Sequence, residues 1–393
     1  MMRDTTQIDP SRDGGEDDVE RTVFISPADL ETAGNPTRTP GNMTRTPGEH
    51  GHPAHGRKEE VDDLVGGVDI NPYISLDLDV SSRLESSLDT VDAKYALLTE
   101  FAEGGTAKVF IARDRNLRRL VAVKSLKKDA PNLAEHLQTF VTEAKVTAQL
   151  DHPGIIPIYG LFRDGEDGIH LVMKLVDGRT LREYLRNLTL NFRARGIGAF
   201  NEKILLRKRL ELFLHVCDTI SYAHHRSVIH RDLKPENIMI GKYMEVYVMD
   251  WGLARVISED DAPPPRSAIS GTPRYFAPEV LRGERLDLRS DIFTLGLILQ
   301  EVVTLQYAVG GNTDRELIDH ALNAELAPIE HRFGRKIDKS LQTVIRKATA
   351  SRMEDRYQTV DDLAEDLRRY MGGLPVSAEH GGVLEKLEHL FHL

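Results

Sequence analysis

The sequence predicts an α+β fold of two lobes, a small β-rich lobe followed by a larger helical lobe. Three runs that begin near residue 95, YALLTEF, KVFIARD and LVAVKSL, are rich in the aromatic and β-branched residues typical of strands. Two further strand-like runs, GIIPIYGLF and IHLVMKLV, precede a mainly helical remainder that extends to about residue 371. Because strands and helices occupy separate parts of the chain, we expect two lobes with a ligand-binding cleft between them.

A helix is expected at about 132–149, between the third and the fourth strand-like runs. Its apolar residues recur at the spacing of one helix face, namely at Leu133, Leu137, Phe140, Val141, Ala144 and Ala148. The small lobe is therefore predicted to hold strands together with one amphipathic helix.

The two ends of the chain differ from this central region. Residues 1–90 are acidic and rich in Pro, Gly and Thr, with Phe24 and Tyr73 as their only aromatic residues, so we expect disorder there. Within them the run YISLDLDV alternates apolar and acidic residues, which suits a strand added to a folded partner. The tail 372–393 has apolar residues at helical spacing and is expected to form a short amphipathic helix.

Composition and charge exclude several classes of protein. A formal net charge of −11 argues against general binding of nucleic acid, which needs a basic surface. No apolar run reaches the length of about 18 residues that a membrane span needs, and the start of the chain lacks the apolar core of a secretory signal. The single cysteine, Cys217, is expected to be a buried core thiol, and we expect a cytoplasmic protein.

Two stretches of the small lobe suggest a phosphate site. EFAEGGTAKVF (100–110) places a glycine-containing turn between two strands, where backbone N–H groups can approach phosphates, although plain hairpins also use Gly-Gly. Lys124 interrupts the apolar strand LVAVKSL, where an ammonium group is costly unless it is exposed or paired. Glu143 on the following helix is the expected partner, in a structural ion pair or in a functional site.

A dense polar cluster follows in VIHRDLKPENIMI (228–240). Between apolar flanks it carries His230, Arg231, Asp232, Lys234, Glu236 and Asn237. After a hairpin turn at Gly241 and Lys242, the next strand ends at Asp250. Such a hairpin brings Asn237 and Asp250 to neighbouring positions, where their oxygen atoms suit Mg²⁺.

These stretches together resemble the protein kinase family, and in particular the bacterial serine/threonine kinases that are related to the eukaryotic enzymes. The resemblance covers about 95–371, with a small lobe at 95–176 and a large lobe at 177–371, and several unrelated signatures fall in the expected order. It implies that Asp232 accepts the proton of the substrate hydroxyl and that Lys234 neutralises the transferred phosphoryl group.

The resemblance also implies where the nucleotide and the metal bind. Asn237 and Asp250 match the two metal ligands, while Lys124 and Glu143 match the ion pair that positions the α- and β-phosphates. Met173 matches the gatekeeper position, Lys174 and Val176 would offer backbone groups to adenine, and Ala122 and Met239 would line the adenine site. The glycine-rich loop would cover ATP with Phe101, Ala102, Glu103, Gly104, Gly105, Thr106, Ala107, Lys108 and Val109.

Further matches are expected to be architectural. Ala277, Pro278 and Glu279 form a family signature, Asp291 belongs to a buried helix, and Arg356 is expected to pair with Glu279. Three residues depart from the family pattern. Ala102 and Ala107 replace glycines of the glycine-rich loop, and Trp251 replaces the usual phenylalanine. We expect Trp251 to pack against the helix that carries Glu143.

The implied activity is transfer of the γ-phosphoryl group of ATP, with Mg²⁺ or Mn²⁺, to serine and threonine hydroxyls of protein substrates. The alternatives are a pseudokinase scaffold that binds nucleotide without turnover and a kinase of small molecules on a similar fold. Expected phosphoacceptors are Thr22, Thr39 and Thr46, which would suit a partner that reads phosphothreonine, and Ser267 and Ser270 after Asp250. Thr272 is expected to bond to Asp232 and Lys234 instead.

Overall fold

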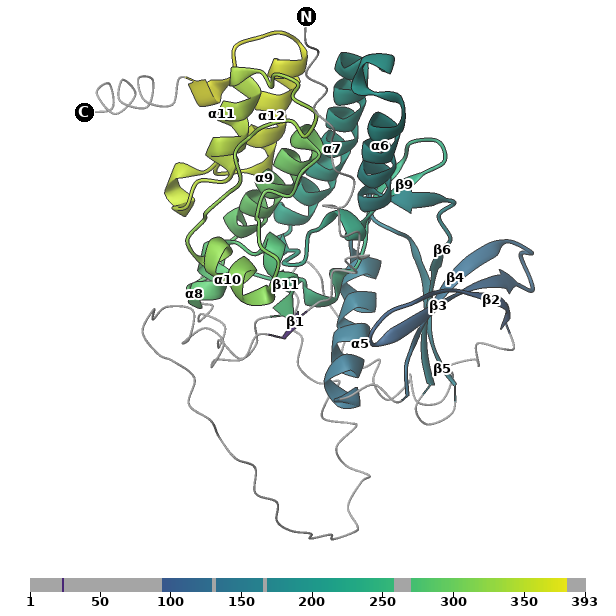
Figure 1. The fold of residues 1–393 in the computed structure, drawn as a ribbon. Coiled ribbons are helices and arrows are strands. Elements are labelled where there is room, and N and C mark those ends of the chain that lie inside the picture. The colour runs from purple at the N-terminus through teal and green to yellow at the C-terminus, as the bar shows by residue number, and fades with distance from the viewer. Residues whose placement is uncertain (1–22, 25–93, 129–131, 165–167, 258–269, 380–393) are drawn as a thin grey trace, which may run out of the picture.

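The computed structural model describes residues 23–24, 94–128, 132–164, 168–257 and 270–379. Within these ranges a five-stranded antiparallel sheet forms the smaller lobe, and helices form most of the larger one (Figure 1). In spatial order the strands are β2 (Tyr95–Glu103), β3 (Ala107–Asp114), β4 (Leu120–Leu126), β6 (Gly168–Lys174) and β5 (Ile158–Asp164). The predicted two-lobed α+β fold is confirmed.

The sheet of the small lobe has a separate apolar cluster on each face. Val121 and Val123 of β4 pack with Tyr95, Phe162 and Val172. The opposite face packs against α5 (Leu133–Gln149), through a cluster formed by Leu126, Phe140, Ala144 and Leu171. Because side chains alternate along a strand, Lys124 shares the α5 face with Leu126, two residues further on.

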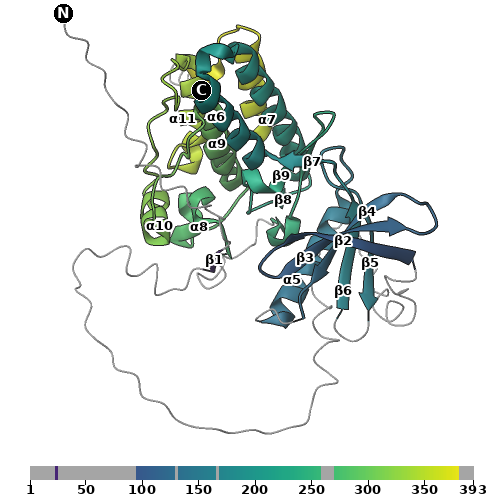
Figure 2. The same ribbon diagram turned by 45° about the vertical axis from the view of Figure 1, so that its right-hand side comes forward.

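Helix α5 lies beside the sheet and faces the helical lobe, as both views show (Figures 1 and 2). It begins and ends within a residue of the predicted helix. The run GIIPIYGLF differs from the prediction, since only its second half belongs to β5. Its first half crosses to the large lobe, where Ile155 bridges to Val248.

The large lobe combines helices with two small antiparallel sheets of its own strands. Its helices are α6 (Leu181–Arg195), α7 (Glu202–His224), α8 (Pro278–Arg282), α9 (Arg289–Thr304), α10 (Asp314–Leu322), α11 (Lys339–Ala348) and α12 (Val360–Met371). One sheet has the order β10 (Val246–Val248), β9 (Ile238–Gly241), β7 (Gly178–Thr180), and the other pairs β8 (Val228–Ile229) with β11 (Arg255–Val256). Single 3₁₀ turns connect them, namely η3 (Ile197–Ala199), η4 (Pro235–Asn237), η5 (Trp251–Leu253), η7 (Pro273–Tyr275), η8 (Met353–Asp355) and η9 (Ser377–Glu379).

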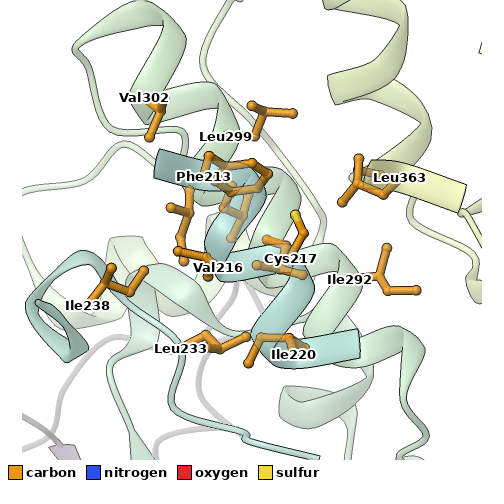
Figure 3. Close-up of a cluster of buried hydrophobic side chains, with 14 of the residues drawn as sticks. Phe213, Val216, Cys217, Ile220, Leu233, Ile238, Ile292, Leu299, Val302 and Leu363 are labelled. Carbon is orange, nitrogen blue, oxygen red and sulfur yellow. The ribbon is translucent and has the colours of Figure 1, made fainter. Parts of the chain in front are cut away.

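The core of the large lobe is built around α7 and α9. Every residue of α9 from Ser290 to Thr304 is buried. Cys217 on α7 lies in the middle of this core, among Phe213, Val216 and Ile220 of the same helix (Figure 3). Burial raises the pKa of the Cys217 thiol, so it stays protonated. The predicted buried core thiol is confirmed.

Residues 189–203, a basic insertion that the family resemblance does not explain, extend α6 and return to the core through an aromatic cluster. Gly196, with φ of 73°, ends the helix, and η3 follows. Phe192 is 1% exposed, with ring centroids of Phe200 at 5.1 Å and Phe333 at 5.5 Å. The insertion therefore contributes to the core of the large lobe.

The ends of the chain are described only in part. Val23–Phe24 form β1, which pairs antiparallel with β12 (Ser270–Gly271). The rest of the predicted disordered segment and the tail helix beyond Glu379 lie outside the described residues. The tail up to Glu379 is held by Asp366, which accepts hydrogen bonds from the Ser377 N–H at 2.6 Å and hydroxyl at 2.8 Å. Within the described ranges, no helix is long and apolar enough to span a membrane.

A buried ion pair joins α8 to the last third of the domain, as predicted. The guanidinium of Arg356 binds both carboxylate oxygens of Glu279, at 2.7 and 2.8 Å. It also donates to the carbonyl groups of Arg289, Ala350 and Ser351. The two side chains are 0% and 2% exposed, so water cannot replace either partner.

Arg356→Ala is expected to destabilise the fold by about 3–5 kcal/mol, because it leaves the Glu279 carboxylate buried and unpaired. Chemical denaturation followed by circular dichroism measures this change. Arg352→Ala is the matched control, since Arg352 and its partner Glu354 are 71% and 57% exposed, and no change is expected. Equal stabilities of the two variants would contradict the buried pair's role.

Candidate active site

Three charged side chains meet where the lobes face each other. Lys124 on β4 donates to both oxygens of Glu143 on α5, at 2.6 and 2.8 Å. The Lys124 ammonium also lies 3.7 Å from an oxygen of Asp250, which follows β10 in the other lobe. The predicted pair of Lys124 and Glu143 is thus present, and it is joined to a residue 126 positions from Lys124 along the chain (250 − 124).

The Lys124 ammonium and the Asp250 carboxylate stabilise each other's charge. Burial lowers the pKa of Lys124, but the nearby carboxylates of Asp250 and Glu143 outweigh it and hold the pKa above the ordinary value. The Lys124 ammonium in turn keeps the pKa of Asp250 below its ordinary value, although burial opposes it. Lys124 is therefore a permanent cation and Asp250 a permanent anion at neutral pH.

The loop between β8 and β9 holds a second charged group. Lys234 lies 2.9 Å from an Asp232 oxygen, and it donates to the Thr272 hydroxyl at 3.0 Å. The side-chain amide of Asn237 donates to the Asp232 carboxylate at 3.0 Å and to the Asp232 backbone carbonyl at 2.8 Å. The predicted contact of Thr272 with Lys234 is present.

Asp291, at the start of α9, binds the backbone of the loop between β8 and β9. Its carboxylate accepts the backbone N–H groups of His230 at 2.8 Å and Arg231 at 3.1 Å, and it contacts the His224 ring at 2.9 Å. Arg231 has a positive φ of 69°, which costs energy for a residue with a side chain. Asp291 thus holds the backbone that carries Asp232, in keeping with its predicted architectural role.

The environment of Asp232 favours a proton acceptor. Burial raises the pKa of Asp232 above its ordinary value, although the Lys234 ammonium lowers it. His230 is fully buried, and burial lowers its pKa, so its ring is neutral. Of Asp232, Lys234 and His230, only Asp232 carries a carboxylate. Its raised pKa makes that carboxylate a stronger base.

Asn237 and Asp250 are adjacent across the hairpin, as predicted. The N–H of Met249 donates to the carbonyl of Asn237 at 2.8 Å, which places Asp250 one residue beyond the pair. The turn is longer than predicted and runs from Lys242 to Glu245. Because the Asn237 amide nitrogen is bound to Asp232, its oxygen is left for a metal. An amide oxygen and an ionised carboxylate fit a hard cation such as Mg²⁺.

Comparison with known proteins identifies the fold that carries these groups. A family model of the protein kinase domain matches residues 95–367. The chain belongs to the protein kinase family. The match contains Lys124, Glu143, Asp232, Asn237 and Asp250, so all the charged groups described above belong to the kinase domain.

Several curated relatives of this kinase domain come from bacteria. The serine/threonine-protein kinase PknD of Chlamydia trachomatis serovar D is 32% identical over 72% of this chain and 32% of its own length. PknD of Protochlamydia amoebophila is 33% identical over 71% of this chain and 30% of its own length. A probable serine/threonine-protein kinase of Streptomyces coelicolor is 31% identical over 72% of this chain and 41% of its own length. The aligned part spans less than half of the length of each of these relatives. The predicted resemblance to bacterial serine/threonine kinases is confirmed.

The two alanines of the glycine-rich loop lie in paired strands, and β2 has a register shift between Glu100 and Ala102. Ala102 pairs with Val109 across β2 and β3, and Ala107 pairs with Leu126 across β3 and β4. Neither has a positive φ, so an added methyl group brings no backbone strain. The turn is closed by the N–H of Gly104, which donates to the carbonyl of Ala107 at 2.9 Å. The kinase domain therefore retains a hairpin in this loop despite both substitutions.

Ion pairs that the sequence did not predict support this loop. Lys127, after β4, contacts Glu103 at 2.6 Å, and Lys108 contacts Glu100 at 3.1 Å. Phe101, by contrast, is 60% exposed. Opposite charges eight or more residues apart in a strand-rich sequence have many potential partners, so periodicity alone could not have paired them.

The predicted adenine-contacting residues lie along β4, β6 and β9. Ala122 pairs with Met173, and Met239 pairs with Thr180 of β7. The N–H of Lys174 donates to the Pro157 carbonyl at 3.0 Å, so its carbonyl, and not its N–H, is the backbone group that we expect to contact adenine.

The side chain of Lys174 contacts a residue of the large lobe. Its ammonium donates to the hydroxyl of Tyr247 on β10 and lies 4.6 Å from the centre of that ring. This contact joins the end of β6 to the large lobe. The backbones of Lys174 and Val176 remain the predicted groups for adenine recognition.

Trp251 is buried in the large lobe. Its indole N–H donates to the Val248 carbonyl at 3.2 Å, and its ring lies 4.5 Å from that of His230. The neighbouring Gly252 adjoins α5, because a Cβ there would lie 3.2 Å from the Thr139 methyl and 3.8 Å from the Glu143 Cβ. The indole N–H of Trp251 thus has a hydrogen-bond partner, and Asp250 still contacts Lys124.

The pH dependence of phosphoryl transfer is expected to follow Asp232. Only the carboxylate form accepts a proton, so the rate falls as the pH drops through a pKa that lies above the ordinary value of about 3.9. Lys234→Met removes a charge that lowers this pKa, and it should shift the acid limb of the single-turnover rate to higher pH. The exposed Lys242→Met serves as the control. An acid limb at the same pH in both variants would contradict this assignment.

Proposed function

We propose that this chain is a serine/threonine protein kinase that transfers the γ-phosphoryl group of ATP to hydroxyl groups of proteins. The observation that carries the proposal is the simultaneous presence of two charged groups. Lys124, Glu143 and Asp250 are aligned across the lobes, and Lys234 and Asn237 both contact Asp232. Family membership and the printed names of the relatives support the same activity.

The proposed step is a single displacement at phosphorus. The substrate oxygen forms a bond to the γ-phosphorus, the bond from that phosphorus to the bridging oxygen breaks, and ADP leaves. Asp232 takes the hydroxyl proton, and Asn237 holds its carboxylate in position. Lys234 offsets the charge of the transferred group, which is the chief electrostatic demand in such reactions.

The metal-dependent part of the proposal rests on Asn237 and Asp250. Mg²⁺, or Mn²⁺ in its place, would neutralise the charge of the ATP phosphates when bound to their oxygens. Lys124 would bind the α- and β-phosphates, held in place by Glu143. The backbone of the turn at Gly104 would cover the phosphates.

These contacts favour catalysis over a pseudokinase scaffold. All the polar groups that the reaction needs are present, and Ala102 and Ala107 leave the strand geometry intact. A protein substrate is favoured over a small molecule by the strand β12, which ends one residue before Thr272. An extended acceptor peptide would pair with such a strand. We also propose a cytoplasmic location, on account of the need for ATP and the free buried Cys217.

Asp232→Asn is expected to lower autophosphorylation with labelled ATP by about 10²–10⁴-fold, because the proton acceptor is lost. The fold should remain, since asparagine has nearly the same size. Asp314→Asn, an exposed change on α10, is the control and should keep the wild-type rate. Wild-type protein that incorporates no phosphate with either Mg²⁺ or Mn²⁺ would overturn the proposed activity.

We further propose acceptor sites within the chain itself. Thr22 immediately precedes β1, which pairs with β12 beside Thr272, and this supports Thr22 over Thr39 and Thr46. Phosphothreonine there would suit a partner that reads this group. In the segment between Asp250 and Glu279, which we call the activation segment, Ser267 and Ser270 are the proposed acceptors.

Two arginines support a phosphate in the activation segment. Burial lowers the pKa of Arg231, and the nearby charge of Arg255 lowers it further. Two cations near each other would be stabilised by the added negative charge of a phosphate.

Phosphosite mapping of autophosphorylated protein by mass spectrometry should find Thr22 and at least one of Ser267 and Ser270. Replacing both serines with alanine is expected to lower the activity on an added protein substrate without abolishing it, because Arg231 loses its counter-charge. Asp232→Asn protein, incubated in parallel, controls for phosphate added before purification. Maps that contain no phosphate before residue 90 would exclude the N-terminal acceptors.

A further inference from the structure

Residues 174–177 connect the two lobes, and we call them the connecting segment. They run from Lys174, the last residue of β6, to the start of β7 at Gly178. Strand β9, which pairs with β7, lies where the lobes meet (Figures 1 and 2). The backbone groups that we expect to contact adenine, those of Lys174 and Val176, belong to this segment. Its position therefore decides where the base of a nucleotide can bind.

Backbone contacts hold the end of the connecting segment that adjoins the large lobe. The N–H of Lys242 donates to the Asp177 carbonyl at 2.8 Å, and Gly178 pairs with Gly241. The strands approach so closely that a Cβ at Gly178 would lie 2.2 Å from the Ile240 carbonyl oxygen. This end of the segment is therefore fixed on the hairpin that β9 and β10 form.

A side chain holds the other end of the segment on the same hairpin. The Lys174 ammonium donates to the hydroxyl of Tyr247 on β10 and lies 4.6 Å from the centre of that ring. The hydrogen bond with Tyr247 raises the pKa of Lys174, burial opposes this change, and the charge of Glu245 adds to the increase. Because Tyr247 is only 6% exposed, its ring is fixed by packing. Lys174 is thus a permanent cation bound to a rigid acceptor.

The backbone N–H of Lys174 is bound elsewhere, since it donates to the Pro157 carbonyl next to β5. The contact between Lys174 and the hairpin therefore depends on two side-chain groups, an ammonium and a phenol hydroxyl. Either group can be removed by substitution without a change of the backbone.

The same hairpin carries the two proposed metal ligands. Asn237 immediately precedes β9, and Asp250 follows the last residue of β10 by two positions. The N–H of Met249 donates to the Asn237 carbonyl at 2.8 Å, which keeps this end of the hairpin together. The connecting segment and the metal ligands are therefore attached to one pair of strands.

A nucleotide that binds through both its base and its phosphates gains from this arrangement. If the two sites are held at the right separation before binding, no affinity is lost to the ordering of either site. If the connecting segment moves relative to Asn237 and Asp250, the cost of ordering it is subtracted from the binding free energy. The contact of Lys174 with Tyr247 restricts that movement.

We propose that Lys174 and Tyr247 are positioning residues for ATP, because their contact fixes the adenine-binding segment relative to Asn237 and Asp250. The ligand that benefits is an adenine nucleotide whose phosphates bind a divalent metal, and the same nucleotide without the metal gains less. This proposal rests on the proposed kinase activity and adds to it a link between the two ends of the nucleotide site. Both residues act through the segment that they hold.

The test is the affinity for a non-hydrolysable ATP analogue, adenylyl imidodiphosphate, measured by isothermal titration calorimetry with Mg²⁺ and with EDTA. We call the ratio of the Kd in EDTA to the Kd in Mg²⁺ the metal gain. Lys174→Met and Tyr247→Phe should each lower the metal gain by about fivefold or more, in keeping with the loss of one hydrogen bond. The double variant should lower it no further, because both changes remove the same contact.

Lys242→Met is the matched control, because Lys242 is an exposed lysine of the same hairpin and keeps its backbone N–H in this variant. Its metal gain should equal that of the wild type. A purely structural role of Lys174 would weaken binding equally in Mg²⁺ and in EDTA and leave the ratio unchanged. Folded Lys174→Met with the wild-type metal gain would therefore overturn the proposal, and so would a double variant whose loss is the product of the two single losses.

Tyr247→Phe is the deciding variant if Lys174→Met does not fold, because phenylalanine keeps the buried ring and removes only the hydroxyl group. A wild-type metal gain in folded Tyr247→Phe would then count against the proposal. Wild-type protein that binds the analogue no more tightly with Mg²⁺ than with EDTA would overturn the proposed metal role of Asn237 and Asp250, and this inference with it.

Discussion

The structure depends on keeping two carboxylates, Asp232 and Asp250, ionised close to each other in a partly buried site. Each raises the cost of charge on the other: the charge of Asp250 contributes to raising the pKa of Asp232, after burial. Two lysines from different elements compensate, Lys124 for Asp250 and Lys234 for Asp232. The positions of β4, α5 and the loop after β8 follow from the need to bring these cations to these anions.

Backbone strain occurs at the same places. Arg231 and Asp250 both have positive φ values, 69° and 62°, although neither is a glycine. Such conformations persist only where neighbouring contacts determine them. For Arg231 the determinant is the Asp291 carboxylate, which binds its N–H from a fully buried helix. Next to Asp250 are the Lys124 ammonium, 3.7 Å from its carboxylate, and the following residue, Trp251, whose indole N–H donates to the Val248 carbonyl.

The large lobe uses buried charges in another way. Arg356 with Glu279, and Arg182 with Glu236 and Glu301, each join elements that are far apart in the sequence. A guanidinium can bind several partners in fixed directions, so it specifies the relative positions of the elements that it joins. Apolar packing around α7 and α9 provides stability but little such direction.

The sequence by itself determined the two lobes, the helix that became α5 and the charged residues of the site, because strand and helix periodicities and short polar motifs are local properties. It also paired Lys124 with Glu143, because an ammonium group in an apolar strand needs a partner, whereas it paired Arg356 with Glu279 only through the family resemblance. Tertiary structure alone decided the contact of Lys174 with Tyr247, the pairing of Ala102 with Val109 and the partners of Arg182. Those partners lie 54 to 119 residues away, and no local pattern specifies which of many acidic residues a distant arginine will meet.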